Sequence, residues 1–257
     1  MFNLSLDNIK KPNESWCYVF GDGPSVKHFE LKYLSDGPSI SCGQLFLRND
    51  FRYLDTRLIS GIEPWLFWPS WTQNQHYLKD YGLISKNMRN YIKSNKNIRF
   101  VINLSNLFFI RSRNVSFYHR KIVKNNQKVN EVAKIMDPFG GSFSTQIILA
   151  HLLGYKKIYL VGFDSWVLNE ASSNRWYEFG EGEFIPNRGY ALDFLNIMSD
   201  VMEIEIISLQ DNYHPTLQSK TYEQHTGIKP VYQENFCLLS SEKLELLASF
   251  PQYKVYK

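Results

Sequence analysis

Short apolar runs alternate along the chain with longer segments whose apolar residues recur at helical spacing. The apolar runs predict strands at 16–20, 39–47, 65–68, 99–104, 157–161 and 203–209. Helical spacing predicts helices at 77–91, 144–153, 188–201 and 241–249, and a further helical segment that carries Val26, Phe29, Leu31 and Leu34. Strands that alternate with helices indicate an α/β protein whose mostly parallel sheet is flanked by helices.

Three segments depart from this alternation. Residues 107–135 are rich in Arg, Lys and Asn and fit either an extra hairpin or an excursion from the sheet. The segment at about 210–257 is irregular apart from its helix. Residues at about 165–187 form a long polar and aromatic loop, and a loop of ~20 residues inside a compact domain is usually a functional lid or a disordered segment. We expect one domain over 1–257 with a lid insertion.

Composition narrows the class of protein. A hydrophobic fraction of 44% provides for a core, and the formal charge of +4 is spread along the chain. This spread argues against a nucleic-acid partner and fits an anionic ligand or a membrane surface equally well. Three widely spaced cysteines suggest a reducing compartment and no zinc knuckle or disulfide framework. We expect a cytoplasmic protein, with peripheral attachment to the inner face of a membrane left open.

Ligands of open parallel sheets bind outside the carboxyl ends of the strands. Four segments with polar or glycine residues follow predicted strands: Gly21–Ser25, Cys42–Gln44, Trp68–Ser70 and Gly162–Asp164. From them we select as candidate donor-binding residues Gly21, Asp22, Gly23, Pro24, Ser25, Gly43, Gln44, Trp68 and Ser70.

The loop Gly21–Ser25 combines two glycines, which allow close ligand approach, with a proline suited to the first turn of a helix. A helix N-terminus attracts phosphate, and Asp22 is able to accept a hydrogen bond from a ribose hydroxyl or a base amine. The alternative is an ordinary strand-to-helix turn with Ser25 as the N-cap. The loop is neither the full dinucleotide fingerprint nor a P-loop.

A second glycine-rich turn precedes the helix predicted at 144–153. Gly141, Ser142 and Ser144 offer backbone N–H groups and hydroxyls that suit a phosphate or a carboxylate. The alternative is a flexible turn with a serine cap.

Candidate catalytic groups lie in the lid and after two strands. Asp164 follows a buried strand, and His214 follows the last clear strand; each is a candidate general base, and each has a structural role as the alternative. The lid contains Trp166, Trp176, Tyr177, Glu181 and Glu183, a content that favours sugar binding over packing on its own domain. No D-x-D, H-E-x-x-H or G-x-S-x-G motif is present, so we expect no metal and no hydrolase elbow.

Three stretches resemble the small bacterial lipooligosaccharide sialyltransferases and the related motility-accessory nonulosonate transferases. Residues 21–25 (GDGPS) are similar to their GNGPS loop, 153–164 (LGYKKIYLVGFD) to LGYKEIYLSGID, and 191–195 (ALDFL) to ALEFL. Order and spacing agree over roughly 16–209. The resemblance implies a Rossmann-like fold with a lid, a CMP-activated sialic-acid-type donor and no metal requirement.

The resemblance also implies roles for single residues. The loop Gly21–Ser25 and Ser142 would hold the nucleotide. The family has a pair of lid tyrosines that assists the departing phosphate; Trp166 stands near the position of the first, and Tyr177 would replace the second. The chain departs from the family at Asp22, Gly43 and Trp68, where the family has Asn. The lid histidine that serves the family as general base is absent between 165 and 190, and Glu181 or Glu183 occupies its neighbourhood.

We therefore predict a metal-independent glycosyltransferase that moves a sugar, such as a nonulosonate, from a nucleotide donor to a glycan hydroxyl at the cell surface. The general base is expected among Glu183, Glu181, Asp164 and His214. The leaving group is expected at Trp166, Tyr177, Ser142 and Ser144. The alternatives are a non-catalytic nucleotide- or glycan-binding module of the same fold, and another Rossmann-like transferase such as a methyltransferase.

Overall fold

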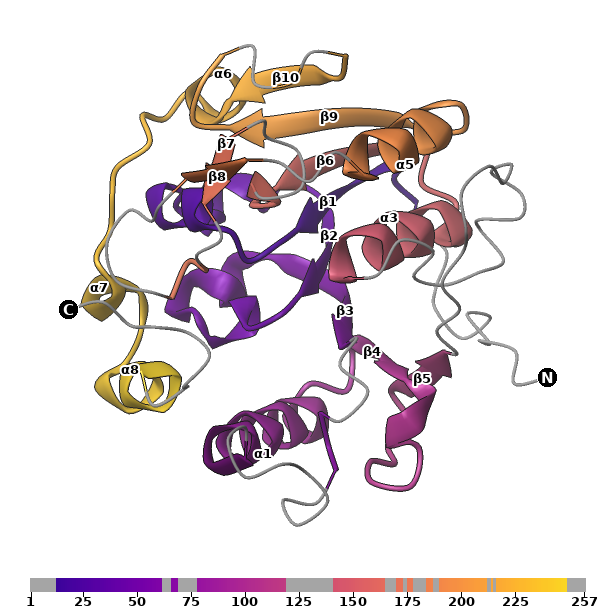
Figure 1. The fold of residues 1–257 in the computed structure, drawn as a ribbon, viewed down its shortest axis with the longest axis vertical. Helices are drawn as coiled ribbons and strands as arrows, with labels where there is room; N and C mark the ends of the chain where they lie inside the picture. The colour runs from indigo at the N-terminus through magenta and orange to yellow at the C-terminus, as the bar shows by residue number, and fades with distance from the viewer. Residues whose placement is uncertain are drawn as a thin grey trace.

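A computed structural model describes residues 13–61, 66–68, 78–118, 141–164, 170–172, 175–177, 184–186, 190–211, 214 and 216–248. Eight strands form one parallel sheet in the order β10-β9-β6-β1-β2-β3-β4-β5. The predicted α/β class with a parallel sheet is confirmed (Figure 1). The strands are β1 Trp16–Phe20, β2 Pro38–Cys42, β3 Asp55–Gly61, β4 Arg99–Asn103, β5 Val115–Tyr118, β6 Lys157–Val161, β9 Glu203–Ser208 and β10 Gln218–Thr221.

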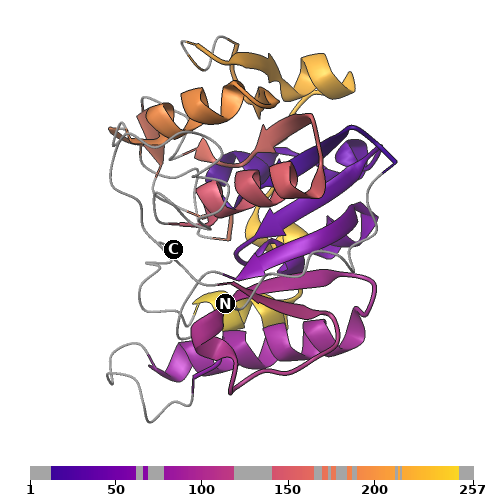
Figure 2. The ribbon, with the colours of Figure 1, turned by 90° about the vertical axis from the view of Figure 1, so that its right-hand side faces the viewer.

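Helices cover both faces of this sheet. The α-helices are α1 Leu78–Ser94, α3 Ser142–Leu153, α5 Tyr190–Ser199, α6 Tyr222–Thr226, α7 Asn235–Leu238 and α8 Ser241–Ala248. Short 3₁₀ helices are η1 Pro24–His28, η2 Leu31–Leu34, η3 Leu45–Leu47, η4 Asn49–Tyr53 and η7 Leu104–Asn106. Figure 1 shows α3 and α5 on one side of the sheet and α7 and α8 on the other, and Figure 2 shows α3 and α5 together after a quarter turn.

The two faces of β1 belong to two separate cores. Cys17 and Val19 pack with the buried residues of α3 and α5, whereas Tyr18 and Phe20 pack with α1, α7, α8 and the 3₁₀ helices. Because strand residues alternate between faces, a continuous apolar run is what a strand covered on both sides requires. This run is why β1 and β6 are predicted correctly from the sequence.

Helix α3 is largely buried. Nine of its twelve residues are buried, and it ends at Gly154, whose φ of 96° is the left-handed conformation of a glycine C-cap. The predicted helix and its stop are confirmed. The serine cap considered as the alternative is not formed: Gly141 occupies the N-cap position, and no side chain caps the helix there.

The first half of the chain differs from its prediction in three places. The helical spacing after Ser25 forms two 3₁₀ helices, because Phe29 between them is extended. The predicted strand at 39–47 ends at Cys42, since Gly43 has a φ of 60°. The predicted strand at 65–68 is wrong, because 66–68 form a turn and the third strand is β3.

Two edge strands were also not predicted. β5 extends the sheet as a parallel strand beside β4 inside the segment 107–135, of which 119–135 lie outside the described residues. β10 pairs in parallel with β9 inside the segment expected to be irregular. Both strands lie at sheet edges, where side chains are only partly buried. Such strands lack the long apolar run by which the central strands are recognised in the sequence.

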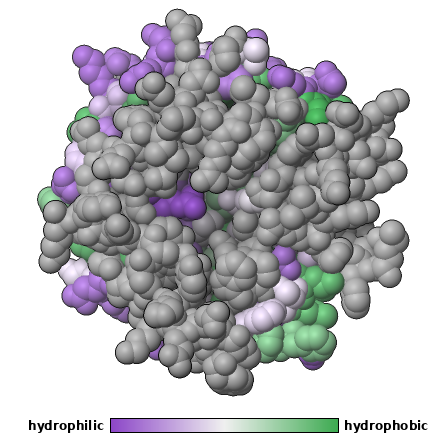
Figure 3. Space-filling view, viewed as in Figure 1, coloured by the Kyte–Doolittle hydropathy of each residue, from purple (hydrophilic) through white to green (hydrophobic). Residues whose placement is uncertain are grey.

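One apolar area of the surface can be located on the fold. In Figure 3 an apolar area lies over β5 and the loop before it, and that loop contains Phe108, which is 79% exposed. Within the described ranges, no helix has the length and apolar character needed to cross a membrane.

Candidate ligand site at the switch point of the sheet

The direction of chain progression reverses around β1. Strands β2 to β5 follow β1 on one side, and the chain then returns through α3 to place β6 on the other side. Gly21 N donates to Val161 O at 2.8 Å, and Gly23 N donates to Gly162 O at 2.8 Å. The loops after β1 and β6 are therefore bound to each other at the topological switch point, where open parallel sheets bind ligands.

Glycine is required on both sides of this contact. A Cβ on Gly21 would lie 2.4 Å from Gly162 O, and a Cβ on Gly23 would lie 2.3 Å from Asp164 Oδ2. Gly162 has a φ of 73°, and a Cβ there would lie 2.3 Å from Val26 Cγ2. These glycines bring the two loops closer together than any other residue allows.

Asp164 fixes the first turn after the glycine loop. Its Oδ2 accepts a hydrogen bond from Ser25 N at 3.0 Å, and the residue is buried. The alternative reading of Ser25 as the N-cap does not hold, since Gly23 is the N-cap of η1 and no side chain caps it. Asp164 holds the loop from across the switch point, so one oxygen of this candidate base already has a structural partner.

Asp22 points from the glycine loop toward the lid. Its Oδ1 lies 2.6 Å from Arg175 Nη1, and its carbonyl accepts from Trp176 N at 2.9 Å. Its other carboxylate oxygen covers the end of β2, where a Cβ on Gly43 would stand 2.4 Å from it. The carboxylate that replaces the Asn of the resembling family therefore occupies the space above Gly43, and an arginine neutralises its charge.

The end of β2 and the start of α3 meet beside Asp22. The Cys42 thiol donates to Phe20 O at 3.5 Å. Burial raises the pKa of this thiol and the charge of Asp22 raises it further, while Ser142, Arg175 and Gln146 lower it. The charges of Asp22 and Arg175 and the polar side chains at the start of α3 therefore all act on the thiol at the end of β2.

Several buried polar atoms around this point have no protein partner among the described residues. They are Ser25 Oγ, Ser41 Oγ, Gln44 Oε1 and Gln146 Oε1. Ser25, Ser41 and Gln146 are at most 5% exposed. Because a buried polar group without a hydrogen bond costs free energy, such atoms indicate a water or a ligand. A polar ligand with several hydrogen-bonding groups fits this set.

Two further predicted donor-binding residues, Trp68 and Tyr177, have contacts of their own. Trp68 Nε1 donates to Ser105 O at 3.0 Å, and its ring lies 6.1 Å from Phe109 near the end of β4. Tyr177 is 1% exposed and packs in the core against Trp176, with its carbonyl bound to Asn235 Nδ2 at 2.7 Å. The Tyr177 side chain therefore belongs to the core cluster of the described residues.

His214 is held as an acceptor. Its Nδ1 accepts from Thr216 N at 3.2 Å and from Leu217 N at 3.0 Å, and burial lowers its pKa. Two N–H donors on Nδ1 place the ring proton on Nε2, so neither nitrogen offers a lone pair to a substrate hydroxyl. This tautomer organises the turn before β10.

The remaining predicted residues, Ser70, Trp166, Glu181 and Glu183, lie outside the described residues. Of the lid segment, the structure describes 175–177 and a two-stranded antiparallel ladder of β7 Glu170–Ser172 and β8 Phe184–Pro186. Gln146 was not selected from the sequence. It lies one turn into α3, and only the fold turns its amide toward Ser60 Oγ, at 3.4 Å.

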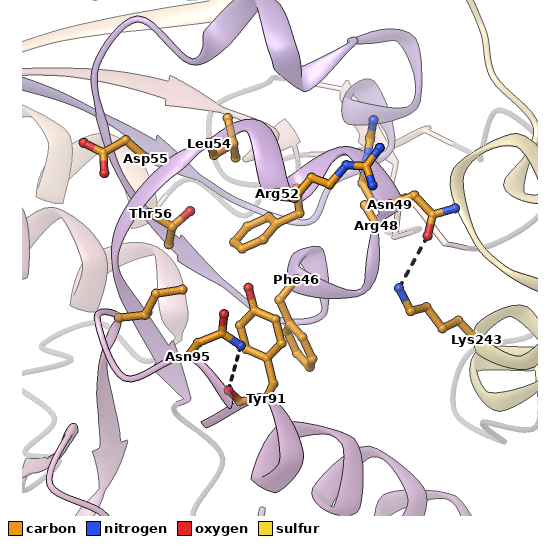
Figure 4. A pocket seen from close by; sticks show the side chains of 12 residues that line it. Phe46, Arg48, Asn49, Arg52, Leu54, Asp55, Thr56, Tyr91, Asn95 and Lys243 are labelled. Carbon is orange, nitrogen blue, oxygen red and sulfur yellow. Dashed lines mark hydrogen bonds between the residues drawn. The ribbon is translucent and has the colours of Figure 1, made fainter. Parts of the chain in front are cut away.

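A hollow of about 700 Å³ lies away from this site, at the amino end of β3 (Figure 4). Asn49 and Lys243 line it and bind each other, and Tyr91 contributes an aromatic wall. None of the residues predicted as site residues lines it. In the part of the chain that the structure describes, no three His, Cys, Asp or Glu residues gather in a way that would hold a metal ion.

Fold and loops together define a parallel α/β protein with a candidate ligand site at its switch point. No family model and no curated protein matches the chain. Among solved structures, the α-2,3-sialyltransferase Cst-I from Campylobacter jejuni is 17% identical, with 96% of this chain and 98% of that chain covered and a TM-score of 0.47. The sialyltransferase CstII from the same organism, in complex with CMP-3FNeuAc, is 14% identical, with 90% and 98% covered and a TM-score of 0.47. Both are sialyltransferases, the class that the sequence motifs resemble.

Proposed function

We propose that this chain is a glycosyltransferase that moves a sugar from a nucleotide-activated donor to a hydroxyl of a glycan. The observation that carries the proposal is the pair of glycine loops at the switch point, together with the buried polar atoms beside them that have no protein partner. The motifs at 21–25 and 153–164, which resemble sialyltransferases, are the sequences that build these two loops.

The donor lies in this proposal between the glycine loop and the start of α3. Backbone close to Gly21 and Gly23 approaches the nucleotide, and Ser142 and the N-terminus of this twelve-residue helix face its phosphate. The resemblance favours a CMP-linked, sialic-acid-like donor and a reaction without metal. The acceptor is a cell-surface glycan, and the protein acts in the cytoplasm, where it uses a nucleotide donor.

The reaction is a displacement at the anomeric carbon. An acceptor hydroxyl oxygen forms the new bond, the bond from the anomeric carbon to the phosphate oxygen breaks, and the nucleotide leaves with the bonding electrons. A base takes the hydroxyl proton. We assign the base to Glu183 or Glu181, because His214 holds its proton on Nε2 and Asp164 is bound to Ser25 N.

Ligand binding is tested first, by saturation-transfer NMR with CMP, UDP, GDP and S-adenosylmethionine. We expect CMP to bind; binding of S-adenosylmethionine alone would identify a methyltransferase. Transfer from CMP-sialic acid to a lactose-type acceptor is then compared between wild type, Glu183→Gln and Glu181→Gln. Loss of about 10²–10⁴-fold in one variant, with CMP binding kept, would identify the general base. The mechanism is wrong if both variants retain wild-type turnover.

The second candidate function is a nucleotide- or glycan-binding module without catalysis. The burial of Tyr177 and the tautomer of His214 favour it, because both residues were expected to act on substrate. Calorimetry combined with a turnover assay separates the two functions. A binding module binds CMP in the calorimeter, and it neither transfers nor hydrolyses CMP-sialic acid.

A further inference from the structure

Asp22 binds the lid residues 175–177 through both its side chain and its backbone. Its carboxylate contacts Arg175 Nη1 at 2.6 Å, and its carbonyl accepts from the next residue, Trp176 N, at 2.9 Å. Because two neighbouring residues, Arg175 and Trp176, both donate to Asp22, the orientation of this segment relative to the glycine loop is fixed as well as its position. The position of the Arg175 guanidinium is therefore set by the glycine loop.

The same three residues are also anchored from behind. The Trp176 side chain is fully buried, and the guanidinium of Arg48 lies 5.6 Å from the centre of its ring. Asn235 Nδ2 donates to Tyr177 O at 2.7 Å. With Trp176 and Tyr177 held in the core, Arg175 extends from a fixed backbone, and its side chain is the part of this segment that reaches the switch point.

The guanidinium lies beside the glycine loop, at the carboxyl end of β1. It binds Asp22 Oδ1, and the other oxygen of the same carboxylate lies over Gly43, where a Cβ would stand 2.4 Å from it. The side chain of Arg175 is 36% exposed, against 13% for Asp22. The arginine is thus the more accessible member of the pair, and its carboxylate partner is turned toward Gly43.

We propose that Arg175 binds the phosphate of the nucleotide donor, and that Asp22 is a positioning residue that holds the guanidinium in place. This inference rests on the proposed function. A guanidinium carries five N–H donors in a planar fork, so donating to Asp22 through Nη1 is compatible with donating to a second oxyanion. It supplies the positive charge that the departing phosphate needs, a task for which the buried Tyr177 is unsuited.

A competing assignment gives Asp22 direct contact with the ribose or the base. The two assignments differ in which part of the ligand each substitution affects. Loss of a phosphate contact weakens a nucleotide and spares its nucleoside, whereas loss of a ribose or base contact weakens both. Substitution of Asp22 by Asn separates charge from geometry, because the amide oxygen still accepts from Nη1.

The experiment measures by calorimetry the affinity of CMP, UMP and GMP, each beside its nucleoside. We expect Arg175→Ala to weaken the bound nucleotide at least tenfold and to change the nucleoside less than twofold. Asp22→Ala weakens the nucleotide threefold to tenfold, and Asp22→Asn restores it to within twofold of wild type. Arg57→Ala is the matched control, because Arg57 pairs with Asp55 at the same 2.6 Å on an exposed part of β3, and it leaves both affinities unchanged.

Each contrary outcome has its own meaning. Unchanged nucleotide binding in Arg175→Ala overturns the assignment and leaves the proposed function standing. Nucleoside binding that falls together with nucleotide binding in Asp22→Ala assigns Asp22 to the ribose or base and overturns its positioning role. Wild-type protein that binds none of the three nucleotides overturns the proposed function along with the assignment. If Arg175→Ala does not fold, Arg175→Lys and Arg175→Gln give the comparison, and we expect lysine to retain more nucleotide affinity than glutamine.

Discussion

Gly23 and Asp164 lie in contact across the switch point of the sheet, where a Cβ on Gly23 would stand 2.3 Å from the carboxylate oxygen Oδ2. The same oxygen accepts a hydrogen bond from Ser25 N. The carboxylate therefore supports the glycine loop by filling the space that a side chain at position 23 would take. The shape of the loop and the position of Asp164 depend on each other.

Gly23→Ala is expected to lower the free energy of unfolding by about 1–3 kcal/mol, because both neighbours of the new methyl group, Asp164 Oδ2 and Gly162 O, are held in place. Urea denaturation measures the change. Gly61→Ala is the control: its Cβ would lie 3.2 Å from the end of the Leu66 side chain, which is able to move. Equal losses in the two variants would contradict the required close approach.

Gly43 and Asp22 are expected to couple energetically. Gly43→Ala is destabilised both by its φ of 60° and by a Cβ that would lie 2.4 Å from Asp22 Oδ2. Asp22→Ala removes the second cause only. A double-mutant cycle on the free energy of unfolding should therefore give a coupling of about 0.5–3 kcal/mol, with the double variant less destabilised than the sum of the two single changes. Additive effects would show that the carboxylate does not occupy this space in solution.

Glu205 is expected to contribute stability that acid removes. Burial tends to raise its pKa, but Lys157 at 2.9 Å and Lys220 at 2.8 Å outweigh burial and lower its pKa below the ordinary value. Its contribution is present above the pKa of the unfolded chain, about 4.3, and is lost as the pH falls through the lower folded pKa. We expect Glu205→Gln to flatten the pH dependence of unfolding below about pH 5. The exposed Glu242→Gln should leave that dependence unchanged, and equal curves for wild type and Glu205→Gln would refute the role of the lysine pair.

Asn114 is expected to join α1 to the edge strand β5. Its Nδ2 donates toward the carbonyls of Ile92 at 3.0 Å, Asn95 at 3.0 Å and Ile98 at 3.2 Å, and the residue is buried. Asn114→Ala removes an N–H group that donates toward these carbonyls, of which Asn95 O also accepts from Ile98 N, and should cost about 1–3 kcal/mol in thermal or urea unfolding. Asn114→Asp, which has no N–H to donate, should be no more stable than Asn114→Ala. A stability for Asn114→Asp close to that of wild type would contradict this explanation.

Prediction from the sequence succeeds where a strand is covered on both faces. β1 and β6 are continuous apolar runs, and the glycine loops that follow them were placed correctly at strand ends. β3 was missed because Asp55 and Arg57 alternate with its buried residues at the exposed start of the strand. The apolar residues 66–68 form a turn. They were predicted as a strand because a short apolar run looks the same in the sequence whether it forms a buried strand or a packed loop.

The sequence predicts which loops form the candidate site, but it does not predict which charged side chains pair there. Parallel strands bring their carboxyl ends to one edge, so the approach of Gly21 and Gly162 follows from the alternating pattern of strands and helices. The pairing of Asp22 with Arg175 depends on how Trp176 packs into a core formed by distant segments. A sequence shows each of these residues, but it does not show which of them the tertiary structure brings together.

The place of β6 between β1 and β9 has a consequence for biosynthesis. A ribosome delivers the chain from its N-terminus, so β1 to β5 emerge long before residues 157–161. Until β6 arrives, one edge of β1 is an unpaired apolar strand, the kind of edge that invites aggregation, and the glycine loop lacks Gly162 and Asp164. The ligand site is therefore absent from every nascent chain that ends before β6. Chaperone contacts during synthesis should concentrate on β1.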